Sequence, residues 1–337
     1  MTPLAGQKLL LIGIGFYDYE AAIATEFRAL GAEVWIENEQ PPGARGVLAP
    51  LRRRLSSGGQ GAQPALRRHQ EAILDRARSR GPLDHVVVIK GTLLDEDFLL
   101  RLRDEQPRAR LTAYHWDSMA RFPDLMRRQA LFDRVLTFDH ADASQFGFVL
   151  RPLFYRPELS RAMPGEATID LCFTGWLHHD RLRQIEAIRT QANALGLSTG
   201  VYLSTGAWTS IKLRVRGQGQ GVHSRPQPFD RYVATTLASR AVLDLPHPQQ
   251  TGLTMRAIET VGAGRKLITT AGDIRGYDFY RPENIHILNG ANPRIDPTFL
   301  RTPSIPLPPD VQERYSLRAW ALDVLGVTAP PNFLRAV

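Results

Sequence analysis

The chain of 337 residues is predicted to be an α/β protein with two doubly wound parallel sheets. Short apolar runs alternate with segments of helical spacing, which is typical of parallel βαβ units. The same series occurs twice, on either side of the segment 151–166, which contains three prolines and resembles a linker. A chain of this length also suits two domains of ordinary size.

In the first half, the apolar run Lys8–Ile14 predicts a strand that is buried on both faces. A helix is expected over Asp18–Leu30, ending at Gly31. The stretch Pro41–Gln63, rich in Pro, Gly, Ser and Arg, is expected to form a surface loop with a short helical patch at Leu48–Leu55. The other expected elements are strands at Glu33–Ile36, His85–Ile89, Leu111–Tyr114 and Val135–Phe138, and helices at Pro64–Arg80, Asp95–Glu105 and Pro123–Leu131.

In the second half, the pattern predicts a long loop over Ala207–Gln227, which holds several glycines and arginines. A final helix is expected over Val311–Leu325, after a proline-rich crossing. The remaining expected elements are strands at Ile169–Thr174, Thr199–Leu203, Ala241–Leu245, Lys266–Thr270 and Asn284–Ile287, and helices at His179–Leu195, Phe229–Ser239 and Thr251–Val261.

These elements predict an N-terminal domain over residues 1–155, a second domain over 165–310 and a C-terminal helix over 311–337 that crosses back to the first domain. We expect the two sheets to face a cleft. Ligands of open parallel sheets bind outside the carboxyl ends of the strands. Candidate functional residues are therefore sought directly after strands.

Composition narrows the function classes. The formal charge of +8 is compatible with nucleic acid, an anionic membrane surface or phosphate-bearing ligands. Nucleic acid is not expected as a partner, because the Lys/Arg runs are short and the sequence shows no nucleic-acid-binding module with interleaved aromatics. Solvated helix faces are the first interpretation of these cations, and attraction to anionic lipid is the second. The chain has one cysteine, Cys172, and shows neither a signal-peptide pattern nor an apolar stretch that could span a bilayer.

The most informative segment follows the strand Ala241–Leu245 and opens the helix Thr251–Val261. Gly252 and Thr254 would present backbone N–H groups at the helix N-terminus, which favours phosphate. Arg256 could clamp a pyrophosphate oxygen. Glu259, one to two turns further, suits two vicinal ribose hydroxyls. The alternative is an ordinary capped helix with a surface Arg and Glu.

The segment 175–181 follows the first strand of the second domain. Gly175 permits close approach of the backbone, and Arg181 on the next helix could meet donor phosphate. His178, His179 and Asp180 suggest a metal site, but adjacent residues do not share a helix face. We therefore favour polar residues at a helix start and expect no metal.

Two candidates for acid–base chemistry follow the strand Leu111–Tyr114. Asp117, and after it His115, could deprotonate an acceptor hydroxyl. The alternative places Asp117 as a helix cap. Lys90, after the strand His85–Ile89, could bind an anionic acceptor or the donor phosphate, or could be a solvated lysine.

The pair Gly13 and Gly15 begins like a dinucleotide fingerprint, but the third glycine is missing. We interpret these glycines as a tight turn beside the acceptor site and expect no nicotinamide cofactor. Asp139 and Asp142 follow the strand Val135–Phe138 and are expected to cap a helix more often than to line a site.

The chain resembles a family of bacterial polysaccharide and lipopolysaccharide biosynthesis proteins, which are glycosyltransferases of the GT-B fold similar to the CgeB-like group. The C-terminal part of the resemblance rests on the segments 250–256, 266–270 and 277–280, together with Glu259, Asn284 and Ile285. The upstream part rests on the segments 114–118, 137–139, 152–155 and 173–175, together with Asp180 and Arg181. The resemblance covers most of the chain from Val86 to Ile287.

The resemblance implies two Rossmann-like domains, a nucleotide-sugar donor in the C-terminal domain, and a glycan or lipid-linked acceptor. It also implies no cofactor and no bound metal. We expect a cytoplasmic protein, and the charge of +8 leaves peripheral contact with the anionic inner face of the membrane open. The implied donor-binding residues are Gly175, Arg181, Gln250, Gly252, Leu253, Thr254, Arg256 and Glu259. The acceptor-binding candidates are Gly13, Gly15 and Lys90. Better-known retaining GT-B enzymes carry a second glutamate eight positions before Glu259, where this chain has Thr251.

Two further functions remain open at this stage. A nucleotide-sugar epimerase of the same fold would share the donor site and differ on the acceptor side. A non-catalytic nucleotide- or sugar-binding protein is compatible with the missing glutamate.

Overall fold

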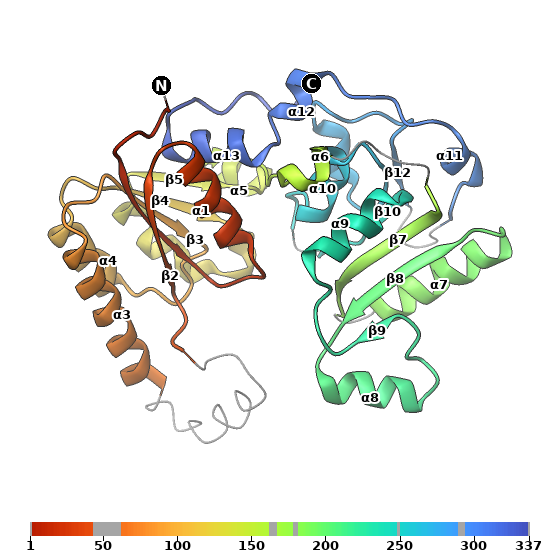
Figure 1. The fold of residues 1–337 in the computed structure, drawn as a ribbon, viewed down its shortest axis with the longest axis horizontal. Helices are drawn as coiled ribbons and strands as arrows, with labels where there is room; N and C mark the ends of the chain where they lie inside the picture. The colour runs from red at the N-terminus through yellow and green to blue at the C-terminus, as the bar shows by residue number, and fades with distance from the viewer. Residues whose placement is uncertain are drawn as a thin grey trace. The chain divides into compact units, whose positions relative to one another are not determined.

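The computed structural model describes residues 2–42, 62–161, 167–177, 181–247, 250–288 and 294–335. The chain divides into two compact units (Figure 1). The first consists of Met1–Pro152 with Trp320–Pro330, and the second of Leu153–Ala319 with Pro331–Val337. The last helix, α13 (Leu317–Leu325), therefore begins in the second unit and continues in the first.

In its described residues, the first unit holds a six-stranded sheet of order β2-β1-β3-β4-β5-β6. Every neighbouring pair of strands is parallel, as the alternating pattern predicts. The strands are β1 (Lys8–Gly13), β2 (Glu33–Asn38), β3 (His85–Ile89), β4 (Arg110–His115), β5 (Arg134–Thr137) and β6 (Val149–Leu150). All their carboxyl ends lie at one edge of the sheet.

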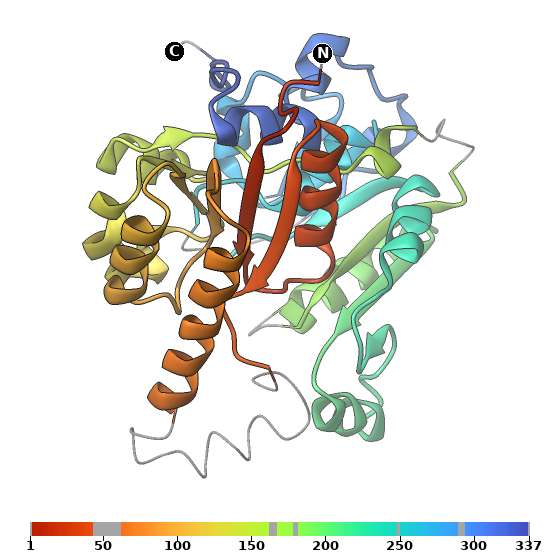
Figure 2. The ribbon, with the colours of Figure 1, turned by 60° about the vertical axis from the view of Figure 1, so that its left-hand side comes forward.

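Helices cover both faces of this sheet because its central strands are apolar on both sides. Leu10 and Ile12 pack with α3 (Ala62–Ser79) and α4 (Glu96–Glu105) in one core cluster. α1 (Tyr19–Ala29) lies on the opposite side of β1 and β2 from α3 (Figure 2). The 3₁₀ segments η1 (Met119–Arg121) and η2 (Pro123–Leu131) and the helix α5 (His140–Phe146) follow β4 and β5.

The second unit repeats this design with a six-stranded sheet of order β12-β11-β10-β7-β8-β9 among its described residues. Each neighbouring pair is again parallel. The strands are β7 (Ile169–Trp176), β8 (Thr199–Ser204), β9 (Val222–His223), β10 (Ser239–Asp244), β11 (Lys266–Thr269) and β12 (Ile285–Ile287).

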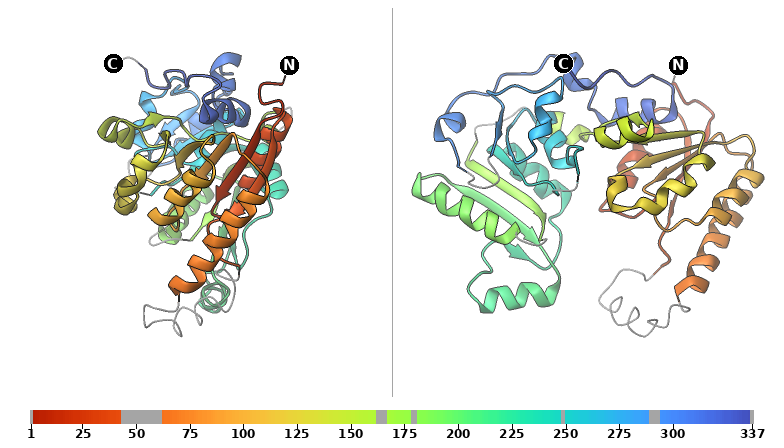
Figure 3. Two further views of the ribbon diagram at one scale, coloured as in Figure 1. Left: turned by 90° about the vertical axis from the view of Figure 1, so that its left-hand side faces the viewer. Right: turned by 180° about the vertical axis from the view of Figure 1, so that it is seen from behind.

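The helix α7 (Arg181–Ala194) runs along β7 and β8 (Figure 3, right). Its Ile185, Ile188 and Ala192 join the core of the second unit. The other helices of this unit are α6 (Pro157–Arg161), α8 (Ala207–Val215), α9 (Phe229–Leu237), α10 (Met255–Gly262), α11 (Pro297–Arg301) and α12 (Pro309–Glu313), with the 3₁₀ segment η3 (Gly272–Gly276).

Several expectations need correction. Ala207–Gln227 is not a long loop, because it contains α8 and the edge strand β9. The helix expected from Thr251 begins only at Met255, since Thr254 is its N-cap. Pro123–Leu131 is a 3₁₀ helix, and β6 was not expected. The loop and helical patch expected within Pro41–Gln63 fall mainly outside the described residues.

The boundary between the two units, after Pro152, falls within the expected linker 151–166, and the described residues on either side of it are packed. Arg151 is fully buried and its Nε lies 2.8 Å from the Asp323 carboxylate within the first unit. Phe154 and Tyr155 are buried as well, and α6 follows them. The prolines of this segment coincide with the change from one unit to the other. Its described residues are nevertheless buried, because several of them carry large apolar side chains. No helix in the described part of the chain is both long and apolar enough to cross a membrane.

Candidate functional site

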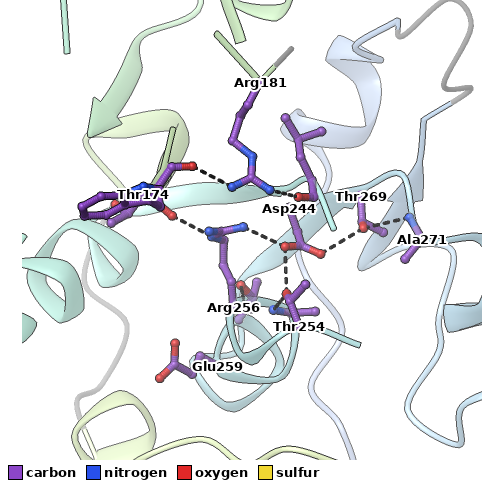
Figure 4. Close-up of polar contacts among 12 residues, drawn as sticks. Thr174, Arg181, Asp244, Thr254, Arg256, Glu259, Thr269 and Ala271 are labelled. Atoms are coloured by element: carbon purple, nitrogen blue, oxygen red, sulfur yellow. Dashed lines mark hydrogen bonds and ion pairs between the residues drawn. The ribbon is translucent and has the colours of Figure 1, made fainter. Parts of the chain in front are cut away.

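The carboxyl edge of the second sheet is organised around the buried carboxylate of Asp244, the last residue of β10. Its Oδ1 accepts a hydrogen bond of 2.8 Å from Thr254 Oγ1 and one of 2.8 Å from Arg256 Nη1. Its Oδ2 accepts one of 3.3 Å from Thr269 Oγ1. Figure 4 shows these three side chains converging on Asp244 from the start of α10 and the end of β11. The carboxylate thereby fixes the start of α10 against the ends of β10 and β11.

Thr254 acts as the N-cap of α10. Its hydroxyl accepts a hydrogen bond from the amide of Ala257, 3.1 Å away, while donating to Asp244. Gly252 and Leu253 precede it and are buried, and the Gln250 amide donates to the His247 carbonyl. The interpretation of an ordinary capped helix is thus confirmed for Thr254, and this cap sets the direction of Arg256.

Arg256 crosses from the first turn of α10 to β7. Its Nε donates to the Thr174 carbonyl at 2.9 Å, and its guanidinium lies 4.6 Å from the centre of the Phe173 ring. A Cβ at position 175 would lie 2.7 Å from Arg256 Nη2. Gly175 therefore permits close approach, as the sequence predicts, and the group that approaches it is this guanidinium.

Arg181, at the start of α7, brings a second guanidinium to the same edge. It donates to the carbonyls of Trp176 and Leu245, each at 2.7 Å, and lies 5.9 Å from the Phe173 ring centre. Burial, and next the nearby charge of Arg256, lower the pKa of Arg181 to about 10, while Asp244 acts in the opposite direction. Two positive charges thus stand beside the single negative charge of Asp244. Such an excess suits a multiply charged anion.

Glu259 lies one turn further along α10, away from the contacts of Asp244 (Figure 4). It is only 1% exposed, and its Oε2 accepts a hydrogen bond of 2.7 Å from the Tyr232 hydroxyl on α9. Burial, and next the charge of Glu259, raise the pKa of Tyr232 well above its usual range. The phenol therefore stays protonated and donates to the carboxylate.

At the carboxyl edge of the first sheet, Asp117 forms ion pairs with two cations. Lys90 Nζ lies 2.6 Å from Asp117 Oδ2, and Arg121 pairs with Oδ1. Lys90 also lies 4.7 Å from the centre of the Phe122 ring, so the cation is held on two sides. The helix cap that the alternative assigned to Asp117 belongs instead to Ser118, which accepts from the Ala120 amide.

Lys90 has a backbone φ of 73°, in the left-handed region that residues with a Cβ rarely adopt. Strain of this kind collects at functional positions. The adjacent Glu39 is buried and accepts a hydrogen bond of 2.9 Å from Thr92 Oγ1. Burial raises its pKa, while the Thr92 bond and the charge of Lys90 act in the opposite direction.

His115 lies below the surface at the end of β4. It is 2% exposed, its Nε2 is 3.0 Å from Gln129 Oε1, and its ring packs on Phe148. Burial lowers its pKa below the ordinary value of 6.5. A neutral, covered imidazole does not reach solvent here, so Asp117 is the better placed of the two base candidates.

The turn after β1 is filled by a side chain of the same chain. The amides of Ile14, Gly15 and Phe16 donate to Glu20 Oε1 at 3.0, 2.9 and 3.2 Å. A Cβ at Gly13 would lie 2.5 Å from Glu20 Cγ. A carboxylate thus holds the position where a dinucleotide fold places phosphate. This agrees with the tight turn that the sequence predicts.

Some contributors were missed by sequence reasoning and others fall outside the structure. Asp244 lies at the end of a predicted strand, where ligands of parallel sheets bind, so its position could have identified it. No sequence pattern pointed to Tyr232 or Glu20. Asp139 caps α5, as expected, whereas Asp142 accepts from the Met119 amide. His178, His179 and Asp180 lie outside the described residues, and the described ones contain no cluster of three metal-ligating side chains.

The chain matches no protein-family model and no curated protein sequence. Solved structures, however, share its fold over nearly the whole length. AviGT4, a glycosyltransferase involved in avilamycin A biosynthesis, is 15% identical with a TM-score of 0.54, covering 96% of this chain and 99% of that one. The catalytic domain of starch synthase IV from Arabidopsis thaliana, bound to ADP and acarbose, is 9% identical with a TM-score of 0.53. The match covers 98% of this chain and 96% of that one.

A third similar structure, the UDP-GlcNAc 2-epimerase from Methanocaldococcus jannaschii, is 11% identical with a TM-score of 0.51, covering 95% of this chain and 99% of that one. At such identities the likeness concerns the fold alone. The chain therefore has the GT-B fold, with two Rossmann-like domains, which glycosyltransferases and nucleotide-sugar epimerases both use.

Proposed function

We propose that this protein is a glycosyltransferase that moves a sugar from a nucleotide-sugar donor to a glycan or lipid-linked acceptor. The second unit binds the donor through its diphosphate. The observation that carries this proposal is the pair Arg181 and Arg256, which meet at the carboxyl ends of β7 and β10 with Asp244 as counter-charge.

The donor site is proposed to work by electrostatics. The bond between the anomeric carbon and the β-phosphate oxygen breaks, and its electron pair leaves with the diphosphate. Arg256, Arg181 and the amides before Thr254 stabilise that charge. Glu259 accepts hydrogen bonds from the ribose hydroxyls, either in place of or in addition to the hydrogen bond from Tyr232. Gly175 leaves room for Arg256. Gln250 and Leu253 complete the donor-binding set, and no metal or cofactor is required.

The first unit is proposed to bind the acceptor. The acceptor oxygen bonds to the anomeric carbon as its proton passes to a base, for which we propose Asp117 if the reaction inverts. If it retains, Asp117 instead orients the sugar. Lys90 keeps Asp117 in place at 2.6 Å and can bind an anionic acceptor group. The turn at Gly13 and Gly15 forms part of the acceptor site. His115, which is covered and bonded to Gln129, takes no proton from the acceptor in this proposal.

The test is a calorimetric titration with UDP-, GDP-, dTDP- and CMP-sugars, followed by incubation of the tightest donor with extracted lipid-linked acceptors. We expect micromolar binding of one donor, and release of its nucleoside diphosphate only when an acceptor is present. Binding that is equal in the wild type and in Arg256→Ala would contradict the donor site.

The fold shared with UDP-GlcNAc 2-epimerase keeps the epimerase alternative open. It predicts that the donor alone is converted to its epimer, with no acceptor and with the sugar still on the nucleotide at equilibrium. Nuclear magnetic resonance of the anomeric and C2 protons distinguishes this result from transfer. A non-catalytic binding protein would bind the donor and change it under neither condition.

The biological role proposed is synthesis of a cell-surface polysaccharide or lipopolysaccharide in the cytoplasm, at the inner face of the membrane. It is supported by the resemblance of the segment 250–259 to that family and by the basic charge of +8. Composition of the surface polysaccharide in a deletion strain tests this role.

A further inference from the structure

The helix α8 carries apolar side chains on the side that faces solvent. Trp208, Ile211 and Val215 are 83%, 52% and 84% exposed. Their spacing of three and four residues places them on one face of the helix. A single exposed apolar residue is ordinary, but three on one face form a stripe that calls for an apolar partner.

The opposite face of α8 anchors the helix to the second unit. Ser210 is buried, and Leu213 packs against the core cluster of this unit. Arg214 Nη2 donates to the Val222 carbonyl of β9 at 3.4 Å. The stripe therefore points away from the protein because the helix has already buried its inner face.

Cations flank the stripe. Lys212, Arg214 and Arg216 are exposed on α8 and just after it, and Arg225 follows β9. The sequence contains no Asp or Glu between Glu186 and Asp230. The surface around the stripe is thus positive, so its partner must be apolar at the centre and anionic around it.

We propose that α8 lies in the headgroup region of an anionic lipid bilayer, with Trp208, Ile211 and Val215 in the acyl boundary. A basic amphipathic helix with Trp on its apolar side is the usual form of an interfacial helix. Lys212 and Arg216 extend beside the stripe to lipid phosphates. A second copy of the chain fits less well, since a symmetric α8–α8 contact brings like charges together.

The placement of α8 suits this role. It follows β8 and stands beside the edge strand β9, apart from the helices that cover the sheet (Figure 1). It is thus reached from the carboxyl edge of the sheet, the edge that also holds Arg181 and Arg256. The proposal deepens the membrane location in the proposed function, but it does not depend on the donor site, because it concerns lipid.

The test is sedimentation of the whole protein with vesicles of phosphatidylcholine alone, or of phosphatidylcholine mixed with phosphatidylglycerol. We expect binding to the anionic vesicles only, and its reversal by salt. The variant W208S/I211S/V215S should lose binding. K212Q/R216Q should bind roughly tenfold or more weakly. Controls of matched chemistry are R67Q/R68Q on α3 and L100S on α4, which should bind like the wild type.

Tryptophan fluorescence gives a second measurement. Emission should shift to the blue when anionic vesicles are added, and W208F should lose this shift while still sedimenting with the vesicles. Titration with the donor or a nucleoside diphosphate should be the same for every variant, which separates this result from any failure of the donor site.

Three results would overturn the proposal. The first is a wild type that stays in the supernatant with anionic vesicles. The second is a triple variant that sediments with them as well as the wild type does. The third is a dimer at high concentration that the triple variant abolishes, without any vesicle binding, since α8 would then contact a second copy.

Discussion

Asp244 and Arg256 form an ion pair of 2.8 Å in which the carboxylate is fully buried and the guanidinium is 15% exposed. The pair joins the end of β10 to the first turn of α10, and it aligns Arg256 with the Thr174 carbonyl. Arg181 adds a second cation nearby and its pKa is lowered to about 10. Two cations thus stand beside the carboxylate of Asp244 before any ligand binds.

Asp244→Asn should destabilise the protein by about 3 kcal/mol, because it leaves buried cations without their counter-charge. A nucleoside diphosphate should restore part of this loss, so it should raise the melting temperature of the variant more than that of the wild type. Thermal unfolding with and without UDP, GDP and dTDP measures both effects. Glu71→Gln, which breaks the exposed pair with Arg101, is the control and should change little. Equal ligand shifts in all three proteins would argue against an anion site.

Glu259→Ala should weaken donor binding by about 2–3 kcal/mol, since charge-assisted hydrogen bonds to the ribose are lost. Tyr232→Phe serves as the matched control, because it removes the 2.7 Å bond yet keeps the carboxylate. It should retain most of the affinity. Calorimetric titration decides the matter: if both variants bind the donor like the wild type, Glu259 has only a structural role beside Tyr232.

Asp117→Asn should leave donor affinity nearly unchanged, because Asp117 belongs to the first unit and the donor residues to the second. Turnover should fall on the order of 100-fold or more if Asp117 takes the acceptor proton. Steady-state rates with donor and acceptor test this. Ser118→Ala, which removes the cap and a hydrogen bond to Asp142 but no charge, is the control. Equal turnover in wild type and Asp117→Asn would remove Asp117 from the mechanism.

Lys90→Gly and Lys90→Ala both remove the ion pair with Asp117, yet they should differ in stability. The φ of 73° strains any residue with a Cβ. We therefore expect the glycine variant to be more stable than the alanine variant by about 1 kcal/mol. Urea unfolding measures the difference. Both should transfer sugar more slowly than the wild type, and a glycine variant less stable than the alanine variant would contradict the strain.

The stability of the protein should fall as the pH drops below 6.5. Burial lowers the pKa of His115 below that ordinary value, so the unfolded chain binds the proton first. The contribution of neutral His115 to stability is fully present above the pKa of histidine in the unfolded chain. It is lost as the pH falls toward the pKa of His115 in the folded protein. Urea unfolding over this range should give a shallower pH dependence for His115→Gln than for the wild type. Identical slopes would show that His115 does not contribute.

Sequence patterns predicted most of the fold because the strands are continuous apolar runs. His85–Ile89 agrees residue for residue, and Lys8–Ile14 differs by one residue. The pattern failed at Ala207–Gln227, because α8 turns Trp208, Ile211 and Val215 outward. An apolar stripe normally marks the buried face, so a helix with an exposed stripe and many nearby glycines resembles a loop.

The sequence by itself determined the two parallel sheets, the strand ends at which ligands of such folds bind, and the residues Gly175, Arg181 and Arg256 as candidates. Only the tertiary structure decided their partners. Arg256 meets Thr174 across 82 positions of the chain, Asp244 binds three side chains from two other elements, and Glu20 fills the turn of Gly13. Spacing along the chain specifies on which face of a helix or strand a residue lies. Which side chains form hydrogen bonds or ion pairs with one another depends on groups that come together only when the sheets form.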